Sequence, residues 1–115
     1  MHKQEYSNQV FINSISRLLT NEKAISLCSD NILIRKFNEK EAMVNQAIFE
    51  ISILDYKPTS KISKRQSVYF INPDYIRRIN YDVHGFVRST TVLRSKELTD
   101  ALDTKITKAF SFSIE

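Results

Sequence analysis

The sequence is poor in the residues that build the commonest catalytic and metal-binding sites. Among its 115 residues there are one glycine, one cysteine, two histidines and no tryptophan. Average usage of about 7% would give about eight glycines, and glycine-rich phosphate loops need several because their backbone amides approach the phosphate closely. A single cysteine excludes an internal disulfide and any zinc site built from several thiolates. We therefore expect a protein that is not an enzyme and that holds no metal or cofactor.

The rest of the composition is that of an ordinary folded domain. Hydrophobic residues make up 42% and charged residues 26%, and 17 Lys and Arg against 13 Asp and Glu give a formal net charge of +4. This positive excess is too small to require nucleic acid as a partner. The polar N-terminal sequence has no signal-peptide pattern, and the most apolar stretch, residues 47–54, is too short to cross a bilayer. We expect one cytoplasmic domain over residues 1–115.

The spacing of apolar residues predicts three helices. In residues 7–21, apolar side chains recur at the intervals of one helical face. Asn38 and Glu41 form a capping-box pattern, which opens a second helix that we expect to continue to Tyr56. Pro73 suits the first position of a third helix. The first two thirds of the chain are thus expected to be mainly helical.

The C-terminal third has the pattern of strands. Residues 90–98 are rich in Thr and Val, and residues 104–114 alternate apolar with small polar side chains, as in a half-buried strand. Residues 24–37 stay ambiguous, because they could extend a helix or contain a short strand at residues 32–34. The polar, basic residues 57–67 are expected to form an exposed loop. The predicted fold is a single α+β domain of about three helices followed by a C-terminal antiparallel β-hairpin.

The titratable residues show no catalytic arrangement. No nucleophile pattern surrounds His84, so we interpret it as a surface residue at a helix end. Glu50 and Asp55 lie five positions apart on the expected second helix, so they would point to different faces and would not form the paired carboxylates of a hydrolase. Cys28 has apolar neighbours and is interpreted as a small core residue. Residues 57–67 contain several Lys and Arg side chains, which could bind phosphate groups. The alternative function is therefore that of a small basic nucleic-acid-binding or regulatory protein.

Three segments, taken together, resemble a known family. Residues 14–21 read Ser-Ile-Ser-Arg-Leu-Leu-Thr-Asn, and residues 52–56 read Ser-Ile-Leu-Asp-Tyr, similar to the family's Ser-Val-Leu-Asn-Tyr-Gly. Arg88 stands where the family has a Phe-Glu-Pro-Arg-Leu ending. On these motifs the sequence is similar to the baseplate wedge family, which includes the phage tail wedge protein and TssE of type VI secretion systems. It departs from the family at Lys57, where glycine is expected, and it lacks the Glu-Pro before Arg88.

The resemblance implies a structural subunit of a contractile injection machine, either a type VI secretion system or a phage-like tail. Its partners would be other wedge proteins, TssF-like and TssG-like, and the subunits of the contractile sheath, with no small-molecule substrate, nucleic acid or membrane insertion. A two-stranded hairpin leaves a free edge, so we expect a sheath strand to pair with it. Arg88 would lie at the base of this hairpin. The side chains that would face the partner are Thr107, Ala109, Ser111 and Ser113.

Overall fold

Six antiparallel strands form one sheet in which the spatial order of the strands follows the chain. The computed structural model describes residues 6–21, 26–29, 31–56 and 64–110, and every statement below concerns these residues. The strands are β1 (Ser26–Ser29), β2 (Ile32–Lys36), β3 (Phe49–Tyr56), β4 (Lys64–Ile71), β5 (Ile76–Tyr81) and β6 (Val87–Leu93). The helices are α1 (Gln9–Asn21), α2 (Glu39–Asn45) and α3 (Lys96–Ala109).

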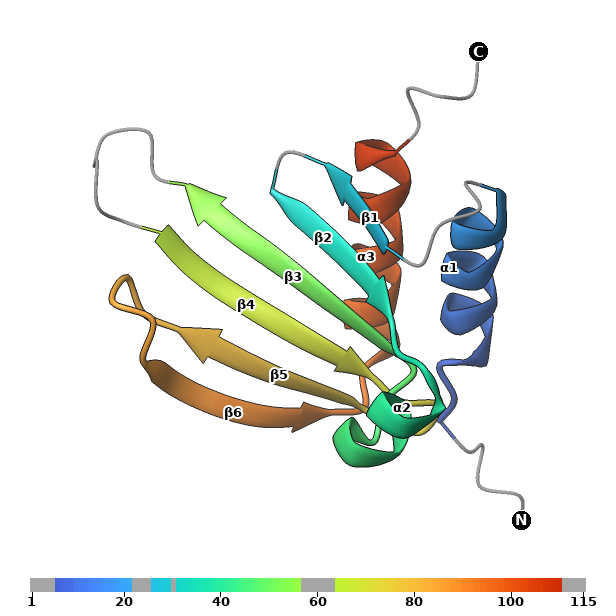
Figure 1. Ribbon diagram of the computed structural model, residues 1–115, viewed down its shortest axis with the longest axis horizontal. Helices are drawn as coiled ribbons and strands as arrows, with labels where there is room; N and C mark the ends of the chain where they lie inside the picture. Colours follow the sequence, from blue (N-terminus) through green and yellow to red (C-terminus); the bar gives the residue numbers. More distant parts are fainter. Residues whose placement is uncertain (1–5, 22–25, 30, 57–63, 111–115) are drawn as a thin grey trace.

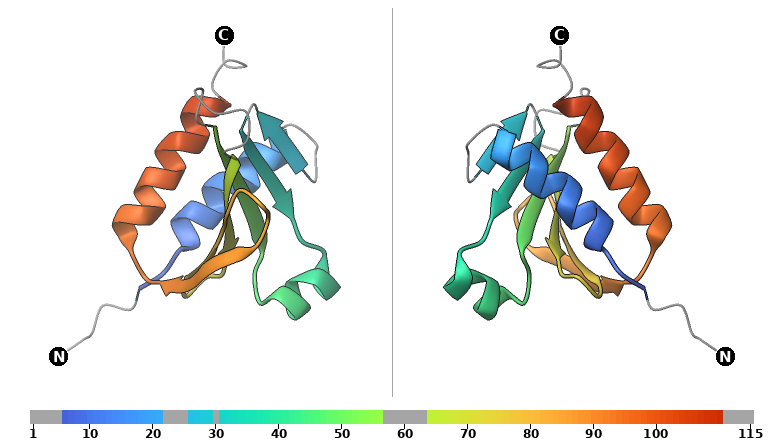
Figure 2. Two further views of the ribbon diagram at one scale, coloured as in Figure 1. Left: turned by 90° about the vertical axis from the view of Figure 1, so that its left-hand side faces the viewer. Right: turned by 90° about the vertical axis from the view of Figure 1, so that its right-hand side faces the viewer.

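Helices α1 and α3 cover one face of the sheet, whereas the short α2 lies at one end of the opposite face (Figures 1 and 2). The core lies between the two long helices and the sheet. On β3 the alternating side chains Phe49, Ile51 and Ile53 are buried, and the register places Ile34 beside Ile51 and Ile32 beside Ile53. Period-two alternation of large apolar residues therefore directs one face of the central strands toward the helices. The same core takes up the apolar stripes of both helices, which include Phe11, Ile15, Leu102 and Ile106.

Local capping chemistry determines where the shorter elements begin. At α2 the Asn38 side chain accepts a hydrogen bond from the Glu41 amide at 2.8 Å, and the Glu41 carboxylate accepts one from the Asn38 amide at 3.2 Å. This confirms the predicted capping box. At α3 the Ser95 hydroxyl accepts a hydrogen bond from the Leu98 amide at 3.2 Å. Both caps satisfy amides that the first turn of a helix leaves without a partner.

The prediction of three helices followed by a C-terminal hairpin is wrong, because strands dominate the chain between α1 and α3. The expected second helix ends at Asn45, where Gln46 takes a left-handed conformation with φ of 53°, and β3 follows within a few residues. The expected third helix is strand β5, and Pro73 lies in the turn between β4 and β5, where the Asn72 amide donates to the Tyr75 carbonyl at 3.0 Å. The short strand considered at residues 32–34 does exist, as part of β2.

The C-terminal segment also differs from its prediction. Residues 104–109 belong to α3 and not to a strand, so the expected hairpin with residues 90–98 does not form. The Thr- and Val-rich residues 90–93 are in a strand, but this strand pairs with β5. Ser111 and Ser113 lie outside the described residues. The expected exposed loop also falls mostly outside them, since β4 begins at Lys64.

The sheet extends beyond the helices that cover it. The turn that joins β5 and β6 lies far from α1 and α3, because these helices lie over the half of the sheet that contains β1, β2 and β3 (Figure 1). The hairpin turn holds Gly85 at φ of +84°, a conformation that glycine adopts without strain. Among the described residues, none of the helices combines the length and the apolar composition that crossing a bilayer requires.

Candidate protein-binding edge

Strand β6 forms a free edge of the sheet, because it pairs with β5 on one side only. It is seven residues long, and most of its residues are exposed. Backbone N–H and C=O groups alternate along a strand, so an edge strand presents a row of them to whatever lies beside it. The opposite edge, β1, has only four residues. Of the two edges of the described sheet, β6 thus offers the longer template for another strand.

Arg88 occupies a β-bulge at the start of this edge. The register pairs Asn80 with Ser89 and Tyr81 with Val87, so Arg88 has no residue opposite it on β5. Bulges increase the local twist of a strand and redirect a side chain. Arg88 is exposed, and both ion pairs of the described residues belong to Arg35. The guanidinium of Arg88 is therefore accessible to a partner at the edge.

The hairpin turn before β6 is held by one carboxylate. Asp82 Oδ1 accepts hydrogen bonds from the amides of His84 at 2.9 Å and Phe86 at 3.0 Å. The Asp82 amide in turn donates to the Phe86 carbonyl at 2.8 Å. The hydrogen bond from Phe86, and then that from His84 with the nearby charges of His84 and Arg88, lower the pKa of Asp82 below its ordinary value of 3.8. The turn thus fixes the chain just before Arg88 enters the edge strand.

The side chains of β6 suit a neighbouring strand. Val87 and Val92 are 58% and 55% exposed, although valine is usually buried. Between them lie Thr90 and Thr91, and β-branched residues of this kind favour cross-strand contacts. The strand contains neither proline nor lysine, two residues by which proteins commonly prevent edge pairing. Apart from the bulge at Arg88, the edge therefore carries little protection.

Positive charge dominates the last two strands. β5 and β6 carry Arg77, Arg78 and Arg88, and neither strand contains a carboxylate. The Arg77 guanidinium lies over the Phe70 ring, with 4.5 Å between its carbon and the ring centroid, and donates to the Asn45 carbonyl at 3.3 Å. Neither of these contacts of Arg77 is with a carboxylate, so its positive charge is not neutralised by them. The potential at this edge favours a partner that carries negative charge.

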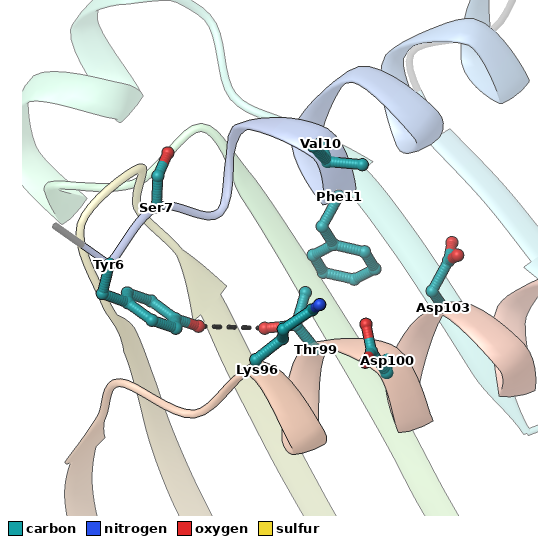
Figure 3. A pocket seen from close by; sticks show the side chains of 8 residues that line it. All are labelled: Tyr6, Ser7, Val10, Phe11, Lys96, Thr99, Asp100 and Asp103. Atoms are coloured by element: carbon teal, nitrogen blue, oxygen red, sulfur yellow. Dashed lines mark hydrogen bonds between the residues drawn. The ribbon is translucent and has the colours of Figure 1, made fainter. Parts of the chain in front are cut away.

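A hollow lies between α1 and α3 (Figure 3). Its volume is about 710 Å³. The residues that line it are Tyr6, Ser7, Val10, Phe11, Lys96, Thr99, Asp100 and Asp103. The hydroxyl groups of Tyr6 and Thr99 lie 3.0 Å apart, and the Thr99 hydroxyl donates to Asn8 Oδ1 at 3.2 Å. These polar groups bond to one another, so they attach the segment before α1 to α3.

The lining of this hollow shows no nucleophile paired with a histidine, unlike the usual catalytic arrangements. Its lining includes no histidine or cysteine. Asp103 accepts a hydrogen bond from the Ser14 hydroxyl at 3.2 Å, but Ser14 does not line this hollow. Within the described ranges there is also no group of three or more side chains that could hold a metal ion. We therefore interpret the hollow as a packing groove between two helices.

The structure separates most of the residues that the sequence singled out. Thr107 is exposed and Ala109 is half-buried, both on α3, and the Ala109 carbonyl accepts a hydrogen bond from Ser29 on β1 at 3.3 Å. Ala109 thus lies at the edge opposite β6 and Arg88. Cys28 is exposed on β1, so its interpretation as a core residue is wrong.

The remaining candidates take ordinary places. His84 is exposed in the β5–β6 turn instead of at a helix end. Glu50 pairs with Arg35 across the sheet, with 3.0 Å between its Oε2 and an Arg35 nitrogen. The side chain of Asp55 lies outside the described part. None of these residues forms a site with Arg88.

Searches against family models, curated proteins and solved structures return no match to the chain. Of the segments that resemble the baseplate wedge family, residues 14–21 lie in α1, residues 52–56 in β3 and Arg88 in β6. Only the first of these has the secondary structure that the resemblance implied. Membership of that family, and the cytoplasmic location expected from the sequence, stay predictions.

Proposed function

We propose that the protein is a non-enzymatic binding module that recruits a partner protein by pairing one of the partner's strands with β6. The observation that carries the proposal is the edge itself. It is a strand of seven residues, five of them exposed, with a positive charge and no carboxylate on β5 or β6. A wedge or sheath subunit of a contractile machine is the partner class that the sequence resemblance suggests. Strand addition at β6 takes the place of the addition at residues 104–114 expected from the sequence.

The occupant of this edge is an extended, acidic protein segment. Backbone amides and carbonyls of β6 require a partner with the same groups, which a nucleic acid lacks. A second copy of this chain would bring another Arg77, Arg78 and Arg88 to the same place, and like charges at short range oppose association. An acidic segment provides both the backbone groups and the complementary charge.

The free energy of binding indicates that side-chain contacts, and not backbone hydrogen bonds, decide which segments bind to β6. Each backbone hydrogen bond contributes about 1 kcal/mol net, whereas ordering each residue of a flexible segment costs about 1–2 kcal/mol. Backbone pairing over seven residues is therefore neutral at best and does not by itself hold a flexible segment. Contacts of the partner with Val87 and Val92, and an ion pair with Arg88, then decide which segments bind.

The test is a selection of binders from a phage-displayed library of random 12-residue peptides, followed by synthesis of the selected peptides. We expect acidic peptides in which N-methylation of alternate residues lowers the affinity at least tenfold, because only every second amide faces β6. Arg88→Glu should weaken these peptides at least tenfold. The matched control is Arg17→Glu, since Arg17 is exposed on α1 and its change should leave the affinity unaltered.

Three results would contradict the proposal. The first is a methylation profile without the two-residue period. The second is an equal effect of both charge reversals. The third is binding of a single-stranded oligonucleotide that Arg88→Glu abolishes while no peptide binds, which would support the alternative nucleic-acid function.

A further inference from the structure

Three rows of side chains cross β4, β5 and β6 on the face that carries the helices. The strand register places the members of each row side by side and ends each row at the free edge. The rows are Ile71–Ile76–Leu93, Tyr69–Arg78–Thr91 and Ser67–Asn80–Ser89. The first row is apolar, the second contains a cation and the third is polar and uncharged. A strand added to β6 would place every second side chain at the end of one of these rows.

The third row is fixed by its own hydrogen bonds. The Ser67 hydroxyl donates to Asn80 Oδ1 at 2.8 Å, and Asn80 Nδ2 donates to the Ser89 hydroxyl at 2.9 Å. Each donor points along the row toward β6. The Ser89 hydroxyl accepts from Asn80, so its own proton is directed to a further acceptor.

The second row contains an incompletely bonded arginine. Arg78 Nε is buried and has no hydrogen-bond partner, and Arg78 belongs to neither ion pair of the described residues. Its neighbours in the row, Tyr69 and Thr91, are uncharged. A buried donor without an acceptor is unfavourable, and a carboxylate is the acceptor that matches a guanidinium best. The Nε of Arg77, the preceding residue, is also buried without a partner, but the Arg77 guanidinium lies over the Phe70 ring and donates to the Asn45 carbonyl.

A partner carboxylate can reach Arg78 across the edge strand. An added strand would lie two strand spacings from β5, about 9.6 Å at about 4.8 Å for each spacing. Thr91 is the only side chain of this row between Arg78 and the added strand, and it is short. The Arg78 side chain, which extends from β5, and an acidic side chain, which extends from the added strand, can therefore meet over Thr91.

We propose that the partner strand carries a Glu or Asp beside Thr91, and that its carboxylate binds Arg78. The inference rests on the proposed strand addition at β6 and specifies the segment that is recognised there. In an antiparallel partner read from its N-terminus, an apolar residue beside Leu93 comes first. The acidic residue follows two positions later, and a hydrogen-bonding residue beside Ser89 comes two positions after that.

The experiment is a double-mutant cycle between Arg78 and the acidic position of a selected peptide, measured by isothermal titration. Changing the peptide Glu to Gln should lower the affinity about tenfold for the wild-type protein and leave it unchanged for Arg78→Ala. Arg78→Glu should bind the peptide with Lys at this position at least tenfold better than the Glu peptide. Arg77→Ala is the matched control, because adjacent residues of a strand face opposite sides of the sheet.

Circular dichroism first establishes that each variant is folded, and Arg78→Gln, which also removes the charge, replaces Arg78→Ala if the latter is not. Equal coupling of the peptide Glu to Arg77 and Arg78, or none to Arg78, would overturn this inference. If the peptide then still protects the β6 amides from hydrogen exchange, strand addition itself stands. If no selected peptide protects those amides, the proposed function fails as well.

Discussion

Replacing Asn8 by alanine should destabilise the protein strongly, because Asn8 stands just before α1 and its side chain makes several hydrogen bonds. Asn8 is 1% exposed and joins three elements just before α1. Its Nδ2 donates to the Asn72 carbonyl at 2.8 Å, and its Oδ1 accepts from the hydroxyls of Tyr6 and Thr99. It therefore links the start of α1 to the β4–β5 turn and to α3.

The expected loss of stability depends on which hydrogen bonds each partner of Asn8 keeps after the substitution. Thr99 and Tyr6 can still donate to the Ser95 carbonyl, so their two lost bonds cost about 1 kcal/mol between them. The part-buried Asn72 carbonyl loses its described donor, and an acceptor left without a partner away from water costs about 1–3 kcal/mol. The sum, about 3 kcal/mol, corresponds to a fall of about 10 °C in Tm for a domain of this size.

Thermal and urea unfolding followed by circular dichroism measure this change. Asn13→Ala is the matched control, because Asn13 is exposed on α1 and its side chain bonds only to the exposed Gln9 in the described structure. We expect the control to change the free energy of unfolding by less than about 0.5 kcal/mol. Equal effects of the two substitutions would refute the reasoning that the Asn8 network joins α1 to the sheet.

Two further predictions concern the turn before β6. Because the pKa of Asp82 is lowered in the folded state, its hydrogen bonds stabilise the turn fully above pH 3.8 and are lost as the pH falls through the lowered pKa. The amide NMR signal of His84 should therefore titrate with a midpoint below 3.8, and a midpoint above it would contradict this assignment. Gly85→Ala should cost about 1–2 kcal/mol in urea unfolding through its positive φ alone, since a Cβ there meets no atom within 4 Å. Gly85→Asn should cost less, and equal costs would contradict a purely backbone effect.

Local chemistry could be read from the sequence where it acts over a few residues. The apolar face of residues 7–21 predicted α1, and Asn38 with Glu41 predicted the start of α2. After that cap, the apolar residues fit both the spacing of a helix and the alternation of a strand. Residues 44–54 contain apolar side chains at helical spacing, but Phe49, Ile51 and Ile53 also alternate as in a strand. The left-handed Gln46 selects the strand, and no local signal in the sequence indicates it.

The binding edge depends on contacts that are distant along the chain. Arg88 was singled out through a family motif, but its place in a bulge follows from the β5–β6 register. The exposure of Val87 and Val92 requires β6 to be an edge strand, and that depends on the order of all six strands. Residues 104–109 belong to α3, so they cannot form the edge strand that the sequence predicted. The last strand of the sheet is β6 instead.

Hydrogen exchange of β6, measured by NMR with and without a selected acidic peptide, tests strand addition most directly. The account predicts that the outward amides of Val87–Leu93 gain protection at every second residue, while the β1 amides of Ser26–Ser29 exchange as before. A peptide that binds with unchanged exchange along β6, or with protection confined to the groove between α1 and α3, would contradict the central claim.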